Sequence, residues 1–448
     1  MPQKKVVILD GAGSGDGDLS PILDVLSQVL QADGAQVETF PLREMKLAHC
    51  LGCFGCWIKT PGICVEADAG REIAKAIIRS DVTVLFTPVT FGGYSPELKK
   101  MVDHFVQLIS PFFEMDHGEV HHTPRYAHRP RLVTVGVQRH PNPYEAHIFK
   151  TLAGRNAINL HPHSYAAEVV LSDSDADALR ERFESLLTRS DALPYGDAAA
   201  SLMPAPVVSG AAVETAGARQ ALLIVGSPKT NEPSTSGALG GYLLDRLKQR
   251  GWETESLTLR ASLNRPEGER GLLSPVERAG LILLVFPLYA DTLPYLVTKA
   301  LAMIAAHRQV SREPSPQRLV GIVNSGFPET HQNSVALAIC REFAAQSGFT
   351  WAGGLAIGGG GMIGGEPLTG KRSGPPIQHV IAALDIAAAA LSEGLPVPAA
   401  AASMIVRNRI PFALFRRLYM WMGGKSFEKL AAKNGIGKDR LMAQPYAA

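Results

Sequence analysis

The sequence predicts an α/β protein made of two doubly wound domains in tandem, each with a five-stranded parallel sheet and helices on both faces. Short apolar segments of strand length alternate with segments whose apolar residues recur at helical spacing. The same order of elements occurs on both sides of a segment rich in Pro, Ala and Gly. Strands that alternate with helices pair in parallel, because each right-handed crossover returns the chain to the same edge of the sheet.

Length and composition agree with two folded cores. A chain of 448 residues is too long for one hydrophobic core, and 46% hydrophobic with 19% charged residues is typical of a folded protein. The formal net charge of +2 shows no basic excess, so it makes no case for a nucleic-acid or membrane partner. The apolar run at 6–9 is too short for a signal peptide, and the longest apolar stretches are too short to cross a bilayer. We therefore expect a cytoplasmic protein with no membrane span.

Each half contains five predicted strands separated by helical segments. The strands of the first half cover 6–9, 36–40, 82–86, 131–137 and 167–171, and its helices cover 19–30, 68–79 and 97–109. The strands of the second half cover 221–225, 253–259, 281–286, 319–324 and 354–357, and its helices cover 238–250, 294–306, 333–347 and 376–391. This repetition predicts an internal duplication.

Composition also predicts the domain boundaries. We expect one domain over 1–190, a linker over 191–218, a second domain over 219–398 and a C-terminal extension over 399–448. The extension mixes Arg with large apolar residues, a pattern that fits a helix lying in a membrane interface or a segment that packs on its own domain or on a partner subunit. We expect the packed arrangement.

Polar loops follow the strands of the second half. In doubly wound sheets ligands bind beyond the carboxyl ends of the strands, where the strand order reverses. The loop 226–237 is rich in Ser and Thr and leads into a helix, which suits either a terminal phosphate or a polar turn with helix caps. Tyr289 follows the third strand and Asn324 begins the loop after the fourth. A planar heterocycle with a phosphate fits this set.

The chain resembles the NADPH-dependent FMN reductase branch of the flavodoxin-like superfamily, which includes the iron–sulfur flavoproteins. The motifs that carry the resemblance are Gly226-Ser227-Pro228-Lys229 with later Ser and Thr, Pro287-Leu288-Tyr289, and the segment 87–99 of the first half. The resemblance covers about 4–188 and 219–395. It implies two flavodoxin-like domains, FMN as cofactor and NAD(P)H as co-substrate.

The resemblance also implies which residues bind FMN. Those expected at the phosphate are Ser227, Lys229, Thr230, Ser234, Thr235 and Ser236. Those expected around the ring are Pro287, Leu288, Tyr289, Ala290, Asp291, Asn324, Ser325 and Gly326, with Pro88, Val89, Thr90, Phe91, Gly92 and Gly93 in the first half.

The first half departs from the family pattern at the phosphate loop. Asp10, Asp16 and Asp18 crowd the turn after the first strand, and carboxylates near a dianion raise its energy. Thr90 stands where the family commonly has Tyr. We therefore expect the better FMN site in the second half.

Four of the five cysteines lie within fifteen residues, as Cys50, Cys53, Cys56 and Cys64. The spacing C-x2-C-x2-C lets thiolates converge on an iron–sulfur cluster, while four thiolates also suit zinc; unmetallated thiols are the third interpretation. The segment resembles the compact cysteine motif of iron–sulfur flavoproteins, which implies a [4Fe–4S] cluster. It follows the second strand, so we expect it at the same sheet edge as the flavin loops.

Together these features predict an FMN-dependent oxidoreductase. Electrons would come from NAD(P)H or a redox partner and go to a small-molecule or protein acceptor, with the cysteine cluster as a relay, while no side chain stands out as a catalytic acid or base. The alternative is a non-catalytic electron carrier or scaffold in which one or both domains are degenerate. We expect either a homo-oligomer or pairing between the two halves of one chain.

Overall fold

The computed structural model describes residues 3–193, 219–229, 233–263, 268–310, 316–369, 377–405 and 410–447. They belong to two compact units, Met1–Leu202 together with Arg416–Ala448, and Met203–Phe415. The predicted linker at 191–218 lies outside the described residues from position 194 onward, so its role stays a prediction.

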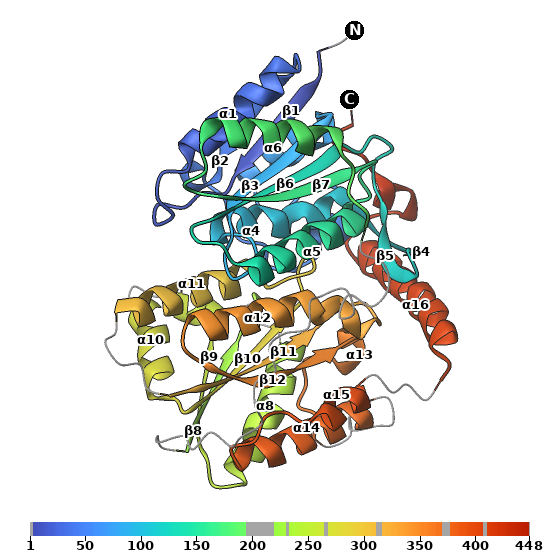
Figure 1. The fold of residues 1–448 in the computed structure, drawn as a ribbon. Coiled ribbons are helices and arrows are strands. Elements are labelled where there is room, and N and C mark those ends of the chain that lie inside the picture. Colours follow the sequence, from blue (N-terminus) through green and yellow to red (C-terminus); the bar gives the residue numbers. More distant parts are fainter. Residues whose placement is uncertain are drawn as a thin grey trace. The chain divides into compact units, whose positions relative to one another are not determined.

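The first unit is built on a parallel sheet of five strands (Figure 1). In spatial order they are β2 (Gln36–Pro41), β1 (Lys5–Asp10), β3 (Val82–Pro88), β6 (Arg131–Gln138) and β7 (Tyr165–Leu171). Every residue of β3 is buried, as expected for a central strand covered on both faces. The strand order reverses between β1 and β3, which is where this topology binds ligands.

Helices cover both faces of this sheet. They are α1 (Ser20–Ala32), α3 (Ala69–Arg79), α4 (Pro96–Val102), α5 (Pro143–Leu160) and α6 (Ala176–Thr188). Figure 1 shows α1 and α6 on one face and α4 and α5 on the other. In α1 the buried residues Ile22, Val25, Leu26 and Val29 recur at helical spacing, so the helix presents one apolar side to the sheet.

The region after α4 differs from the predicted helix over 97–109. A 3-10 helix, η2 (Asp103–Leu108), follows α4 and leads into an antiparallel hairpin of β4 (Ile109–Asp116) and β5 (Glu119–Pro124). The hairpin turns at His117 and Gly118, which both have positive φ, at 50° and 84°. Two-residue turns of this kind favour Asn-Gly or Asp-Gly, so His-Gly gave a weak sequence signal.

The second unit repeats the topology of the first. Its parallel sheet has the spatial order β9 (Glu253–Thr258), β8 (Gln220–Val225), β10 (Leu281–Pro287), β11 (Arg318–Asn324) and β12 (Thr350–Ile357). In both units the order is 2-1-3-4-5 by position along the chain, which is the flavodoxin-like order. The predicted fold class is therefore confirmed: two flavodoxin-like domains, each with a five-stranded parallel sheet.

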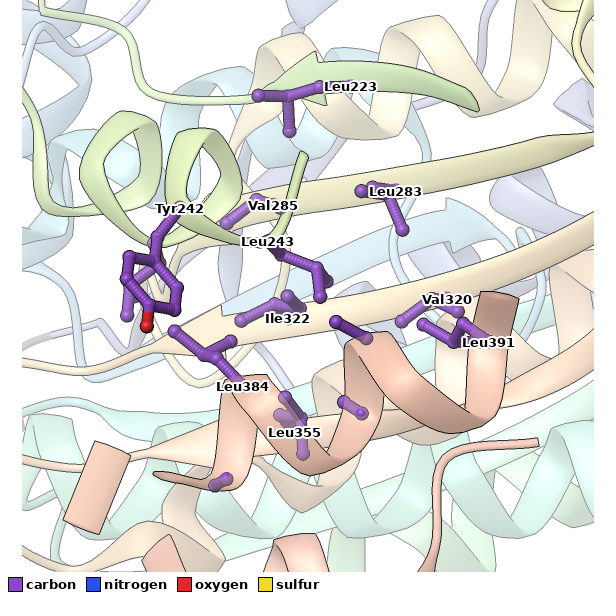
Figure 2. Close-up of a cluster of buried hydrophobic side chains, with 14 of the residues drawn as sticks. Leu223, Tyr242, Leu243, Leu283, Val285, Val320, Ile322, Leu355, Leu384 and Leu391 are labelled. Atoms are coloured by element: carbon purple, nitrogen blue, oxygen red, sulfur yellow. The ribbon is translucent and has the colours of Figure 1, made fainter. Parts of the chain in front are cut away.

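The described helices of the second unit also cover both faces of its sheet (Figure 1). They are α8 (Thr235–Lys248), α9 (Leu259–Leu263), α10 (Gly268–Arg278), α11 (Tyr295–Val310), η3 (Thr330–Asn333), α12 (Ser334–Gln346), α13 (Gly360–Ile363), α14 (Gln378–Ser392) and α15 (Ala399–Ile405). Figure 2 shows the core on one face, where Leu243 of α8 and Leu384 of α14 point at Ile322 and Leu355 of the strands. This packing fixes the start of α8 at the carboxyl edge of the sheet.

The chain returns to the first unit after the second. Helix α16 (Phe412–Lys433) and the short η5 (Lys438–Met442) carry it there, and residues from Arg416 onward belong to the first unit. Within the described ranges, no helix combines the length and hydropathy that a membrane span requires.

Candidate functional site

The loop after β1 in the first unit is held tightly at the carboxyl edge. The Gly11 amide donates to the Phe86 carbonyl at 2.8 Å, and the Ser95 hydroxyl donates to the Gly11 carbonyl at 2.6 Å. A Cβ at Gly11 would lie 2.5 Å from the Leu98 Cβ, so this close approach requires glycine. The turn therefore packs directly against the start of α4.

Carboxylates already occupy the amides of this loop. The Ala12 amide donates to Asp10 Oδ1 at 2.9 Å, and the Gly13 amide donates to Asp16 Oδ2 at 2.7 Å. Burial raises the pKa of Asp10, although the hydrogen bond from Ala12 opposes the shift. A phosphate here would have to displace two carboxylates and would meet their negative charge, so the loop as it stands does not fit a phosphate.

The loop after β3 forms a tight turn. Thr90 and Gly93 exchange backbone hydrogen bonds of 3.0 and 2.8 Å, while Phe91 and Gly92 have positive φ at 56° and 84°. The predicted ring-binding residues Pro88, Val89, Thr90, Phe91, Gly92 and Gly93 all lie in or next to this turn. The turn is anchored from the neighbouring strand, because the Val89 amide donates to the Val137 carbonyl at 2.9 Å.

The second unit has the same turn after β10. Tyr289 and Thr292 exchange backbone hydrogen bonds of 2.9 and 3.1 Å, and Ala290 and Asp291 have positive φ at 46° and 60°. Two consecutive non-glycine residues in the left-handed region are unfavourable, and such strain gathers at functional sites. Tyr289 occupies the turn position that Thr90 occupies in the first unit. Pro287 and Leu288 lead into this turn, half-buried at the sheet edge.

Three of the predicted phosphate residues of the second unit, Ser234, Thr235 and Ser236, lie at the start of α8. Ser234 caps the helix by accepting from the Gly237 amide at 3.0 Å, and Ser227 is buried in the loop before it. The Thr235 hydroxyl donates to the Gly360 carbonyl at 3.2 Å, and the Ser236 hydroxyl donates to Asn324 Oδ1 at 2.8 Å. Lys229 lies in the same loop and is exposed, whereas Thr230 lies outside the described residues.

Three loops of the second unit are joined by backbone hydrogen bonds. Leu288 donates to the Asn324 carbonyl at 2.9 Å, and Gly360 donates to the Ser325 carbonyl at 2.8 Å. Gly326 is exposed next to Ser325. The structure thus brings the residues predicted after β8, β10 and β11 to one sheet edge, where their binding roles stay predictions.

The sequence analysis missed the glycine-rich loop after β12. A Cβ at Gly360 would lie 3.0 Å from the Ser325 carbonyl oxygen, and one at Gly365 would lie 2.2 Å from the Pro233 carbonyl oxygen. The loop therefore approaches both the α8 start and the β11 loop through backbone alone. Four successive glycines at 358–361, directly after a predicted strand, were the signal that could have identified it.

The four clustered cysteines lie in the connection between β2 and α3. Cys53 is exposed, Cys50 and Cys64 are half-buried, and Cys56 is buried on the short helix α2 (Gly55–Ile58). Burial raises the pKa of Cys50 to about 12 and that of Cys56 well above its usual value, and each effect is strengthened by the neighbouring thiols. Burial also raises the pKa of Cys64. The four side chains are therefore electrostatic neighbours.

The donor set of this loop, four soft thiols, fits an iron–sulfur cluster or zinc. Among the described residues, no group of three or more His, Cys, Asp or Glu side chains is arranged as a finished metal site. Four thiols are nonetheless present, and the amides of Gly52 and Gly55 point at Cys50 Sγ and Cys53 Sγ at 3.5 and 3.4 Å. Amide hydrogen bonds to sulfur are characteristic of thiolate clusters.

A buried cation lies beside these thiols. Arg125 is 1% exposed, and its charge lowers the pKa of Cys56, which opposes the effect of burial. Its Nη1 donates to the carbonyls of Leu441 and Ala443 at 2.9 Å each, while Nη2 has no hydrogen-bond partner among the described residues. Such a cation would offset the negative charge that four thiolates bring into a buried site.

The cysteine loop rests on η2. The Trp57 indole donates to the carbonyls of Val106 and Ile109 at 2.8 and 3.1 Å, and the Cys64 amide donates to Gln107 Oε1 at 3.0 Å. These bonds hold the four-cysteine segment in its middle, at Trp57, and at its C-terminal end, at Cys64.

The C-terminal segment covers the other side of the loop. Phe427 of α16 packs on Trp57 and Phe54 with ring centroids 5.0 and 5.6 Å apart. A Cβ at Gly62 would lie 2.6 Å from Pro445, and the Tyr446 hydroxyl donates to Gln107 Oε1 at 3.3 Å. The segment 416–447 is therefore part of the wall around the thiols.

Shortening Phe427 should loosen this wall. We expect Phe427→Ala to destabilise the state in which α16 covers the cysteine loop by about 2 kcal/mol. The loss is smaller than for a fully buried Phe, because this ring is half-buried. The fraction of molecules in which the loop is uncovered should therefore rise more than tenfold. The measurement is the alkylation rate of Cys56 in the metal-free protein, read by mass spectrometry. Leu418→Ala, on the exposed side of the same helix, is the control. Equal alkylation rates in the two variants would contradict the covering role.

Two cavities of the first unit lie away from the carboxyl edge. One, of about 50 Å³, is lined by Thr83, Leu132 and Arg125 near the amino ends of β3 and β6. The other, of about 570 Å³, is a surface depression lined by both charged and apolar residues of β1, β2 and α3. Neither coincides with the loops predicted to bind a cofactor.

Residues 4–169 match a family model described as NADPH-dependent FMN reductase. The chain is 30% identical over 99 residues to an iron-sulfur flavoprotein of Methanocaldococcus jannaschii, a match that covers 22% of this chain and 50% of that protein. It is 28% identical over 102 residues to an iron-sulfur flavoprotein of Archaeoglobus fulgidus, which covers 23% of this chain and 46% of the relative. The chain thus spans about half the length of the curated relatives it matches.

Solved structures share similarity with part of the chain. An NAD(P)H:quinone oxidoreductase from Methanothermobacter marburgensis matches with 13% identity and a TM-score of 0.33, over 42% of this chain and 100% of that one. The resemblance to NADPH-dependent FMN reductases and iron–sulfur flavoproteins stated from the sequence is confirmed by the family match and the curated relatives. The family match falls on the first unit.

Proposed function

We propose that this chain is an FMN-dependent oxidoreductase that takes electrons from NAD(P)H or a redox partner and passes them to a small-molecule or protein acceptor. The observation that carries the proposal is the match of residues 4–169 to an FMN reductase family, on a domain that holds four clustered thiols and whose topology the second unit repeats. Bound FMN supplies hydride acceptance and electron transfer, while the protein supplies position and electrostatics.

The two units divide these tasks in our proposal, with FMN in the second unit and the thiols in the first. The phosphate loop of the first unit is already satisfied by Asp10 and Asp16. The loop at 227–236 carries one acidic residue, Glu232, against Lys229, and leads into a 14-residue helix whose N-terminus favours an anion. Ser227 and Ser234 then bind the phosphate side of the cofactor.

The ring side of the cofactor is assigned to the neighbouring loops of the same sheet edge. The strained turn Tyr289–Asp291 and the segment Asn324–Gly326 border the ring in this proposal. Tyr289 provides an aromatic face, and the backbone amides of the two loops provide hydrogen-bond donors to the ring edge.

Cys50, Cys53, Cys56 and Cys64 hold a [4Fe–4S] cluster in this proposal. The amides of Gly52 and Gly55, the buried Arg125 and the cover formed by Phe427 support it. A bound cluster supplies one-electron transfer. Zinc satisfies the same four thiolates but carries no electrons, so metal analysis separates the two.

The experiment is a visible spectrum of the full-length protein purified without oxygen, with FMN quantified after release. We expect flavin absorbance, about one FMN per chain, and bleaching of the flavin bands by NADH or NADPH. A colourless protein that cannot be reconstituted with FMN would contradict the proposal. That result would instead favour the scaffold alternative, in which the satisfied phosphate loop of the first unit is one sign of degeneracy.

A further inference from the structure

Helix α16 has one face fixed to the first unit. Tyr419 packs on Phe113 with ring centroids 5.4 Å apart, and a Cβ at Gly423 would lie 2.6 Å from the Phe113 ring. One turn later Phe427 packs on Trp57 at 5.0 Å. These contacts set the rotation of the helix, so the opposite face is determined too.

The opposite face is apolar and exposed. Leu414, Leu418, Trp421 and Met422 have the helical spacing i, i+4, i+7 and i+8, and they are 57%, 43%, 64% and 54% exposed. An exposed apolar stripe that includes a largely exposed Trp is uncommon on a folded protein. Such a stripe indicates a surface that binds a membrane or another molecule.

The same helix is strongly basic. Between 416 and 433 it carries five basic residues, Arg416, Arg417, Lys425, Lys429 and Lys433, against one acidic residue, Glu428. This contrasts with the net charge of +2 for the whole chain of 448 residues. Lys425 and Lys429 continue the exposed face at i+11 and i+15, so its first half is apolar and its second half basic.

The single carboxylate does not neutralise this face. Glu428 is 20% exposed and forms ion pairs with Lys425 at 2.9 Å and Lys438 at 3.0 Å. Within the described part of the chain, Arg417, Lys429 and Lys433 form no ion pair. Their charges stay available to an anionic surface.

We propose that the exposed face of α16 binds the surface of an anionic membrane, with the helix lying in the plane of the interface. Leu414, Leu418 and Met422 would enter the boundary between headgroups and acyl chains, Trp421 would sit at headgroup level, and the Lys and Arg side chains would contact anionic headgroups. Charge complementarity favours an anionic lipid surface. A second copy of the chain would bring the same positive charges to the contact and would be repelled. The proposal is independent of the redox function.

Binding of this kind would place the cysteine loop near the lipid. The inner face of α16 contacts Trp57, the neighbour of Cys56, so one helix diameter of about 10 Å separates the loop from the membrane. An acceptor dissolved in the membrane would then be within reach of the first unit.

The test is co-sedimentation of the full-length protein with lipid vesicles. We expect binding to vesicles in which about a third of the lipid is phosphatidylserine, and none to pure phosphatidylcholine. Binding should weaken as salt rises, because the Debye length falls. The double variant Arg417→Gln, Lys429→Gln should lose roughly fivefold in affinity per charge at low salt.

A second pair of variants tests the apolar stripe. Leu418→Glu with Trp421→Glu should abolish sedimentation, and both sites are exposed, so folding is expected to be unaffected. Val310→Glu, at a residue that is 80% exposed in the second unit, is the matched control and should bind like the wild type. In the wild type, brominated acyl chains should quench tryptophan fluorescence, and Trp421→Ser should remove most of that quenching.

Three results would overturn the proposal. One is no sedimentation with the phosphatidylserine vesicles at low salt. Another is sedimentation that the Leu418 and Trp421 variants retain, which would place lipid binding elsewhere. The third is a wild-type oligomer that the same variants convert to a monomer without any lipid binding, which would assign the stripe to a contact between copies of this chain.

Discussion

Replacing Ser227 with Asp should remove FMN from the protein. Ser227 is buried in the loop that we assign to the phosphate, which precedes α8 in the sequence. A unit charge about 4 Å from a like charge is destabilising by about 4 kcal/mol at an effective dielectric constant of 20, which is roughly a thousandfold loss of affinity. The measurement is FMN affinity by fluorescence titration of the full-length apoprotein.

The control is the same substitution in the corresponding loop of the first unit. Ser14 is exposed there, directly after Ala12 and Gly13, whose amides already bind Asp10 and Asp16, so Ser14→Asp should leave FMN binding unchanged. The opposite result, with flavin lost in Ser14→Asp and kept in Ser227→Asp, would move the FMN site to the first unit. Loss in both variants with intact folding would show that each unit contributes to binding.

Replacing Cys53 with Ser should abolish cluster assembly. Protein purified without oxygen should contain about four iron atoms and equivalent acid-labile sulfide per chain, and the variant should fall below one, because an exposed hydroxyl is a poor ligand for iron. Cys53 is exposed, so the substitution should not disturb the core. Iron and sulfide assays give the result directly.

Cys340→Ala provides the matched control for this experiment. Cys340 is buried on α12 in the second unit, far along the chain from the clustered thiols, and its removal should leave the iron content unchanged. About one zinc per chain in place of iron would identify a structural zinc site. If the protein contains no metal and Cys53→Ser does not change the rate of flavin reduction, the four cysteines are unmetallated thiols.

The sheets could be predicted from the sequence because buried parallel strands are nearly continuous apolar runs. Thus 82–86 and 281–286 predicted β3 and β10 with one to two residues of error at their ends. The hairpin β4–β5 was missed, because its strands follow a 3-10 helix without a break and its His-Gly turn is an uncommon pair. Helices α5, α6 and α10 were also left out of the predicted pattern.

The candidate site was predictable where a loop directly follows a strand. The two turns at 90–93 and 289–292 lie where the topology rule requires, and their positive φ values could not be read from residues such as Ala290. The carboxylates that the sequence places in the first phosphate loop bind its backbone, as the hydrogen bond from the Gly13 amide to Asp16 shows. Contacts such as that of Trp57 with Phe427 join residues 370 positions apart, and no local pattern encodes them.

Because the chain returns to the first unit only at its end, the cysteine loop is covered late in synthesis. The wall that Phe427 and Arg125 help to form around the thiols is completed by residues that are made only after all of 203–415. At about 5–20 residues per second, a ribosome needs roughly 10–40 s for that stretch. Throughout this interval the emerged first domain presents a cysteine loop that 416–447 do not yet cover, so the four thiols are accessible before the last helix docks.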